Sequence, residues 1–159
     1  NRGPKTSLQE IFRRALHYSF DEELRVFIYS KSVTRQRISA LTTLVAQAAR
    51  EGDAIAQDIL RRAGIELAKL AVNLAERLQI DSAPVNISLV GGVPLSNPPV
   101  VQSFKEYIAQ MIPQANYVAP QYEPWIGAVL LAYELAELEV TSDQVQAIGE
   151  NAAALLKAQ

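Results

Sequence analysis

Apolar residues recur along most of the chain at the three- and four-residue spacing of amphipathic helices. This spacing predicts helices that begin near Thr6 or Ser7, near Ser19 and near Thr34. The third of them should end at Gly52, because glycine readily adopts the left-handed conformation that closes many helices. Two of the starts also have the spacing of a capping box, Ser7 with Glu10 and Ser19 with Glu22.

The next helix is predicted to be the longest. Asp53 can cap its start, and the pattern continues to about Gln79, which makes a helix of about 40 Å at 1.5 Å per residue. Many residues of the predicted buried face are alanines, so we expect another element to pack closely against it. That face comprises Ala56, Ile59, Leu60, Ala63, Leu67, Leu70, Ala71, Leu74 and Leu78.

Two short segments have the character of strands. They are Val85–Val90, which we expect to be buried on both faces, and Ala115–Val118. A helix that opens with Pro98 and Pro99 joins them, so they should lie parallel. Because two parallel strands do not make a self-sufficient layer, partner strands are expected outside this chain. Further helices are predicted from about Pro124 to Leu138 and from Thr141 or Ser142 onwards.

The first of these strands stops at two adjacent glycines, Gly91 and Gly92. The carboxyl end of a strand is where open α/β sheets bind ligands, and bare backbone there lets a flat ligand or a phosphate approach closely. The pair also fits a tight turn that needs a positive φ, so both interpretations stay open. Ser96 and Asn97 are predicted to cap the next helix, although residues in this place can also reach a ribose.

Composition narrows the classes of function. The 159 residues are enough for about one domain, 49% are hydrophobic, and a net charge of −2 gives no general attraction to nucleic acid or anionic membranes. The chain has no cysteine and a single histidine, which excludes thiolate metal sites, iron–sulfur clusters and the usual histidine-rich zinc sites. No apolar run reaches the length of a membrane span. Since no initiator methionine or signal peptide is present, Asn1 is expected to be a cut or an internal boundary rather than the native start.

Four motifs carry a resemblance. In chain order they are Arg2-Gly-Pro-Lys-Thr6, Ala49-x-x-Gly52-Asp53-x-x-Ala56-x-x-Ile59-Leu60, Leu89-Val-Gly-Gly-Val93 and Gly127-Ala128-x-x-Leu131-Ala132. Over roughly Arg2 to Glu134 the chain thereby resembles the carboxyl-terminal half of N-acetylglucosamine kinases and the related BadF/BadG/BcrA/BcrD-type ATPases. These proteins belong to the superfamily of sugar kinases, actin and Hsp70.

The resemblance implies an α/β fold, the carboxyl-terminal part of a ribonuclease-H-like (actin-like ATPase) lobe, rich in helices and with a short remnant of parallel sheet. Residues 1–139 would form this partial lobe, and residues 140–159 an extra helix. The adenosine of ATP would lie at Gly91, Gly92, Val93 and Ser96, with Gly127 starting a helix that packs beneath them. Gly127 can also simply permit close packing.

The implied activity is transfer of the γ-phosphoryl group of ATP to an amino sugar, with Mg²⁺. The phosphate loops and the catalytic carboxylate of such kinases lie upstream, so no catalytic or metal-binding residue is assigned here. The implied partners are the upstream half of the same protein and a sugar, without nucleic acid or membrane, in the cytoplasm; a homodimer stays open. Alternatives are a non-kinase ATPase lobe and a helical interaction module. An activator of radical dehydratases is disfavoured, because it needs cysteines for its cluster.

Overall fold

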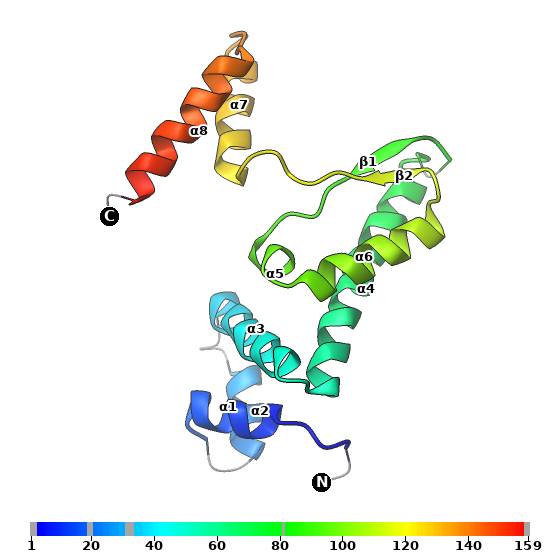
Figure 1. Ribbon diagram of the computed structural model, residues 1–159, viewed down its shortest axis with the longest axis vertical. Coiled ribbons are helices and arrows are strands. Elements are labelled where there is room, and N and C mark those ends of the chain that lie inside the picture. The colour runs from blue at the N-terminus through cyan, green and yellow to red at the C-terminus, as the bar shows by residue number, and fades with distance from the viewer. Residues whose placement is uncertain (1–2, 19–20, 31–33, 81, 158–159) are drawn as a thin grey trace. The chain divides into compact units, whose positions relative to one another are not determined.

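The computed structural model describes residues 3–18, 21–30, 34–80 and 82–157 (Figure 1). Helices dominate this part of the chain, and a short parallel sheet accompanies them, so the predicted α/β class is confirmed. The chain divides into two compact units, Asn1–Tyr117 and Val118–Gln159, which we describe separately.

The first unit holds six helices and two strands within the described residues. In chain order they are α1 (Leu8–Leu16), α2 (Asp21–Tyr29), α3 (Arg35–Arg50), α4 (Ala54–Arg77), β1 (Val85–Ile87), α5 (Gly92–Leu95), α6 (Pro98–Met111) and β2 (Ala115–Tyr117). The second unit contains α7 (Pro124–Leu135) and α8 (Ser142–Lys157).

Most predicted helix ends are confirmed. The hydroxyl of Thr34 accepts a hydrogen bond from the Arg37 amide at the start of α3, and Gly52, with φ of +92°, follows its end. Asp53 caps α4 by accepting from the amides of Ile55 and Ala56. Prolines open α6, and Thr141 accepts from the Gln144 amide at the start of α8. The predicted pair of Ser19 with Glu22 lies partly outside the described residues.

The predicted capping box of Ser7 with Glu10 is wrong. Ser7 has helical backbone angles and makes no capping bond, while Glu10 forms an ion pair with Arg14. Both the amide and the hydroxyl of Ser7 donate to Asp53 instead, and the hydroxyl of Thr6 donates to the same carboxylate oxygen, Oδ2. We call these three hydrogen bonds the Asp53 clasp. Asp53, rather than Glu10, therefore accepts from the Ser7 amide.

Helix α4 connects the two hydrophobic clusters of the first unit. One cluster joins the first half of α4 to α1, α3 and the start of α6, through Leu8, Val45, Ala48, Ala49, Ala56, Leu60 and Val100. The other joins its second half to α6 and to the segment that contains the sheet, through Ala68, Val72, Ala75, Leu89, Phe104, Ile108 and Ile112. The segment that leads to the glycine pair is therefore anchored at Leu89.

The close neighbour expected for the alanine-rich helix is α6. The two helices meet at Gly64, where an added Cβ would lie 2.2 Å from both the Ser103 hydroxyl and the Val100 carbonyl oxygen. No side chain fits in that space, so glycine allows the two backbones to approach one another. The prediction of a closely packed partner is confirmed.

The predicted buried face of α4 is wrong in its second half. Leu70, Leu74 and Leu78 are 67%, 56% and 58% exposed, while Val72 and Ala75 are buried. The buried side follows from Gly64, because the small residues that face α6 determine how the helix is rotated. We call the three exposed residues the leucine ridge.

The first strand is shorter than predicted. β1 pairs in parallel with β2, with Val85 opposite Ala115 and Ile87 opposite Tyr117, which confirms the predicted direction. The extent to Val90 and the burial of both faces are wrong, since Asn86 is exposed and Val90 is 50% exposed. Within the described residues β1 has β2 as its one partner, so the short β2 limits the length of the ladder.

The second unit is a pair of helices. α7 and α8 pack through Ile126 and Gly149, where an added Cβ on the glycine would lie 3.5 Å from Ile126 Cδ1, an ordinary contact. α7 ends at Leu135, three residues before the predicted end, and Glu137 adopts a positive φ of 54°.

Candidate functional site

The glycine pair forms a sharp corner after the buried Leu89. Gly91 has φ of +122°, a conformation that side-chain-bearing residues rarely adopt, so the interpretation as a turn that needs positive φ is confirmed for this residue. Gly92 begins the short helix α5, which was not predicted, and the Gly91 carbonyl accepts from the Leu95 amide. A Cβ added at Gly92 would meet no atom within 4 Å. Gly91 therefore shapes the chain, whereas Gly92 keeps a space free.

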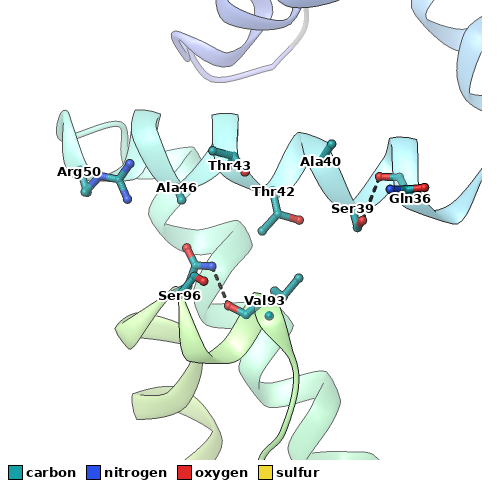
Figure 2. A pocket seen from close by; sticks show the side chains of 11 residues that line it. Gln36, Ser39, Ala40, Thr42, Thr43, Ala46, Arg50, Val93 and Ser96 are labelled. Carbon is teal, nitrogen blue, oxygen red and sulfur yellow. Dashed lines mark hydrogen bonds between the residues drawn. The ribbon is translucent and has the colours of Figure 1, made fainter. Parts of the chain in front are cut away.

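A cavity of about 480 Å³ lies beside this corner, and we call it the corner cavity. Helix α3 forms one wall and α5 with its flanking residues the other. Figure 2 shows Thr42 and Ala46 of α3 facing Val93 of α5 and Ser96, which directly follows α5. The lining residues are mainly neutral and polar: Gln36, Ser39, Ala40, Thr42, Thr43, Ala46, Arg50, Gly92, Val93, Ser96 and Asn97. Hydroxyl and amide groups of this kind can hydrogen-bond a ribose or a base.

Asn97 holds the α5 wall together. It is a buried polar residue, 5% exposed, and its Nδ2 donates to the Val93 carbonyl at 2.6 Å. The predicted capping of α6 by the side chains of Ser96 and Asn97 is therefore wrong, because Asn97 makes no capping bond and Ser96 ends α5. The side chain of Asn97 closes the turn through its hydrogen bond to Val93. Ser96 lines the corner cavity.

A second cavity of about 620 Å³ adjoins the first, with α3, α4 and the start of α6 around it. We call it the adjoining cavity. Its lining combines apolar residues such as Leu60, Pro98 and Pro99 with polar residues at its rim. Four residues line both cavities: Ala46, Arg50, Ser96 and Asn97. A ligand that enters one cavity can therefore extend towards the other.

The structure brings four of the predicted site residues together. Gly92, Val93 and Ser96 line the corner cavity, and Gly91 forms the turn directly before them. Gly127 belongs to the second unit, in the first turn of α7, where it is exposed and an added Cβ would meet no atom within 4 Å.

The α3 wall was missed by the sequence interpretation. Its cavity-lining residues repeat at helical spacing opposite the buried Val45, Ala48 and Ala49, and they include Ser39, Thr42, Thr43 and Arg50. A polar face with several hydroxyl side chains was the available signal, but a face of this kind is also typical of a helix surface in contact with water.

Two features are absent from the part of the chain that the structure describes. In that part of the chain, no group of three or more His, Cys, Asp or Glu side chains is arranged to hold a metal ion. None of its helices combines the length and the apolar character needed to cross a membrane.

Comparison with known proteins adds two findings. Residues 1–132 match the model of the BadF/BadG/BcrA/BcrD ATPase family. The chain is also 28% identical, over 131 residues, to the N-acetylmuramic acid/N-acetylglucosamine kinase of Clostridium acetobutylicum. The match covers 82% of this chain and 43% of that kinase, so the chain spans less than half the length of this relative.

Proposed function

The chain belongs to the BadF/BadG/BcrA/BcrD ATPase family, and from this premise we propose that it is the ATP-binding carboxyl-terminal portion of an ATP-dependent sugar kinase. The similarity to a kinase that acts on N-acetylmuramic acid and N-acetylglucosamine supports an amino sugar as the phosphoryl acceptor. In this proposal, residues 1–139 are part of a ribonuclease-H-like lobe and residues 140–159 form an additional helix.

The length of the relative supports an upstream half of the same protein as the main partner, since the match covers 43% of that kinase. We propose that this half supplies the phosphate loops, the carboxylate that holds Mg²⁺ and the catalytic base. We also propose that the complete protein works in the cytoplasm.

The corner cavity is the observation that carries the nucleotide part of the proposal. Gly92 presents bare backbone to a cavity lined by hydroxyl and amide groups, which fits the adenosine of ATP. When ATP and Mg²⁺ are bound, they supply the phosphoryl group and neutralise its charge during transfer. This chain holds the nucleoside: Gly91 sets the turn, Gly92 leaves room for the ligand, Val93 offers an apolar surface and Ser96 a hydroxyl.

Replacement of Gly92 tests the proposal directly. In the full-length protein, Gly92→Val should weaken ATP binding by more than about tenfold, or about 1.4 kcal/mol, because the new side chain occupies the space of the ligand. Since a Cβ at Gly92 meets no protein atom within 4 Å, the fold should be retained. Gly92→Ala should give a smaller loss. Isothermal titration calorimetry measures the affinity, and circular dichroism checks the fold.

Gly91→Val is the contrasting variant. The positive φ of Gly91 strains any side chain there, so this variant should lose thermal stability as well as ATP affinity. ATP binding by a folded Gly92→Val protein at wild-type affinity would contradict the proposed site. Absence of ATP binding by the wild-type protein would instead favour the helical interaction module.

A further inference from the structure

Arg50 occupies a distinctive place among the cavity residues. It lies in the last turn of α3 and lines both the corner cavity and the adjoining cavity. The other residues that line the corner cavity are uncharged, so Arg50 provides its single charged side chain within the described part of the chain. A cavity with one cationic side chain among otherwise uncharged residues favours a ligand that carries negative charge at that position.

The side chain of Arg50 is also available to a ligand. Arg61 and Arg62 both pair with Asp58 on α4, and Arg14 pairs with Glu10 on α1. Arg50 forms no ion pair within the residues that the structure describes, and the neighbouring Glu51 accepts from Gln47. No protein carboxylate in this part of the chain therefore has to be displaced before Arg50 can contact a ligand.

We propose that Arg50 binds a phosphate group of the nucleotide held in the corner cavity, an inference that rests on the proposed function. A guanidinium is planar and donates two parallel hydrogen bonds, which match the oxygens of a phosphate. The position of Arg50 between the two cavities lets the nucleoside occupy the neutral part while its charged end reaches the arginine.

The test compares ligands that differ only in phosphate. In the full-length protein, Arg50→Gln should weaken the binding of ADP and ATP by about tenfold or more, and should leave that of adenosine within about twofold of wild type. Arg50→Lys keeps the charge without the planar fork, so it should give an intermediate loss. Calorimetry measures ADP and ATP directly and adenosine by displacement.

Arg77→Gln is the matched control. Arg77 also lies in the last turn of its helix, α4, so removing its charge costs a similar interaction with the helix dipole. Unlike Arg50, Arg77 lines neither cavity. Its ADP affinity should equal that of wild type. A further readout is salt: the affinity for ADP should fall with added salt more steeply in wild type than in Arg50→Gln.

The outcomes separate this inference from the function on which it rests. If wild type binds ADP and Arg50→Gln loses adenosine and ADP equally, or loses neither, the phosphate contact is wrong while nucleotide binding stands. If wild type binds no adenine nucleotide, the proposed function fails as well. A loss confined to the phosphorylated ligands supports Arg50 as a phosphate-binding residue.

Discussion

At the scale of single residues, Asp53 connects two distant parts of the first unit. Its carboxylate accepts hydrogen bonds from the amides of Ile55 and Ala56 through Oδ1, and takes part in the Asp53 clasp through Oδ2. The hydrogen bond from Ala56, reinforced by those from Ser7 and Thr6 and partly opposed by desolvation, holds the pKa of Asp53 well below its usual value. Its ionised form is therefore stabilised by the fold.

This lowered pKa predicts acid sensitivity. A carboxyl whose pKa is lower in the folded state stabilises the fold above its ordinary pKa of 3.8, and that contribution is lost as the pH falls further. Asp53→Asn keeps an oxygen to cap α4, but its NH₂ group cannot accept the clasp bonds. Wild type should therefore be more stable than Asp53→Asn near neutral pH, and the difference should shrink on acidification. Urea unfolding of both proteins, near neutral pH and at acidic pH, measures this difference in the free energy of unfolding.

Asp53→Ala provides the control for the cap. It removes the capping bonds as well as the clasp, so it should cost about 0.5–2 kcal/mol more than Asp53→Asn. An equal dependence on pH in wild type and Asp53→Asn would show that the folded state does not lower the pKa of Asp53.

The cap could be predicted from sequence and the clasp could not. A cap is a local feature, visible as an Asp after the helix-ending Gly52. The clasp joins Asp53 to Thr6 and Ser7, which precede it by 47 and 46 positions, and nothing in the local spacing reveals that contact. Ser7 was assigned to Glu10 because that pairing is the nearest one in sequence.

At the scale of elements, the contact between α4 and α6 depends on one missing side chain. Alanine is normally preferred to glycine inside a helix by about 1 kcal/mol. At Gly64 the added methyl would overlap the Val100 carbonyl, which belongs to the backbone and cannot rotate away. We therefore predict that Gly64→Ala destabilises the fold by about 1–3 kcal/mol despite the better helix propensity. Urea unfolding followed by circular dichroism measures the change.

Gly149→Ala is the matched control for this change. Gly149 is also inside a helix, α8, but its added Cβ would make an ordinary contact with Ile126 at 3.5 Å. That variant should be neutral or slightly stabilising. A Gly64→Ala protein as stable as Gly149→Ala would mean that α4 and α6 can separate without cost.

The positions of the helices could be predicted from the sequence because their signals are local. The rotation of α4 about its own axis, which decides the side that faces α6, could not. The leucines at 70, 74 and 78 have the spacing of a buried stripe, yet the side that faces α6 is chosen by Gly64 and Ala68. The same reason limits the strand: the length of β1 depends on its partner β2 rather than on its own apolar residues.

At the scale of the whole molecule, the first unit exposes several large apolar side chains and an open strand edge. All three residues of the leucine ridge are more than half exposed, and β1 has one paired edge among the described residues. Exposed apolar ridges and open strand edges are typical of surfaces that another chain covers. We therefore predict that the purified 159-residue chain self-associates or copurifies with the upstream segment, which sedimentation velocity and mass spectrometry will detect.

Substitution within the leucine ridge measures its contribution to self-association. Leu74→Glu places a charge at the centre of the leucine ridge and should shift the chain towards the monomer. Val26→Glu changes a side chain of similar exposure, 69%, on α2 and should not. A wild-type chain that sediments as a monomer without a second polypeptide would contradict the prediction.

One wall of the corner cavity contains residues that the sequence interpretation had named. Gly92, Val93 and Ser96 follow a strand-like segment and belong to a motif of the family resemblance, so they could be named without the structure. The opposite wall comes from α3, more than forty positions earlier, and only the packing of α3 against α4 brings Thr42 and Arg50 to the corner cavity.

The clasp also has a consequence for the order of assembly. Its donors and its acceptor are separated by 46 or 47 positions, and closing so long a loop costs chain entropy before any bond forms. The acceptor, by contrast, sits at a corner between two helices whose own contacts are nearer in sequence. We therefore predict that the beginning of the chain is attached late in folding, after the corner of α3 and α4 exists, and that α1 detaches more readily than α3 or α4 when the native state opens locally.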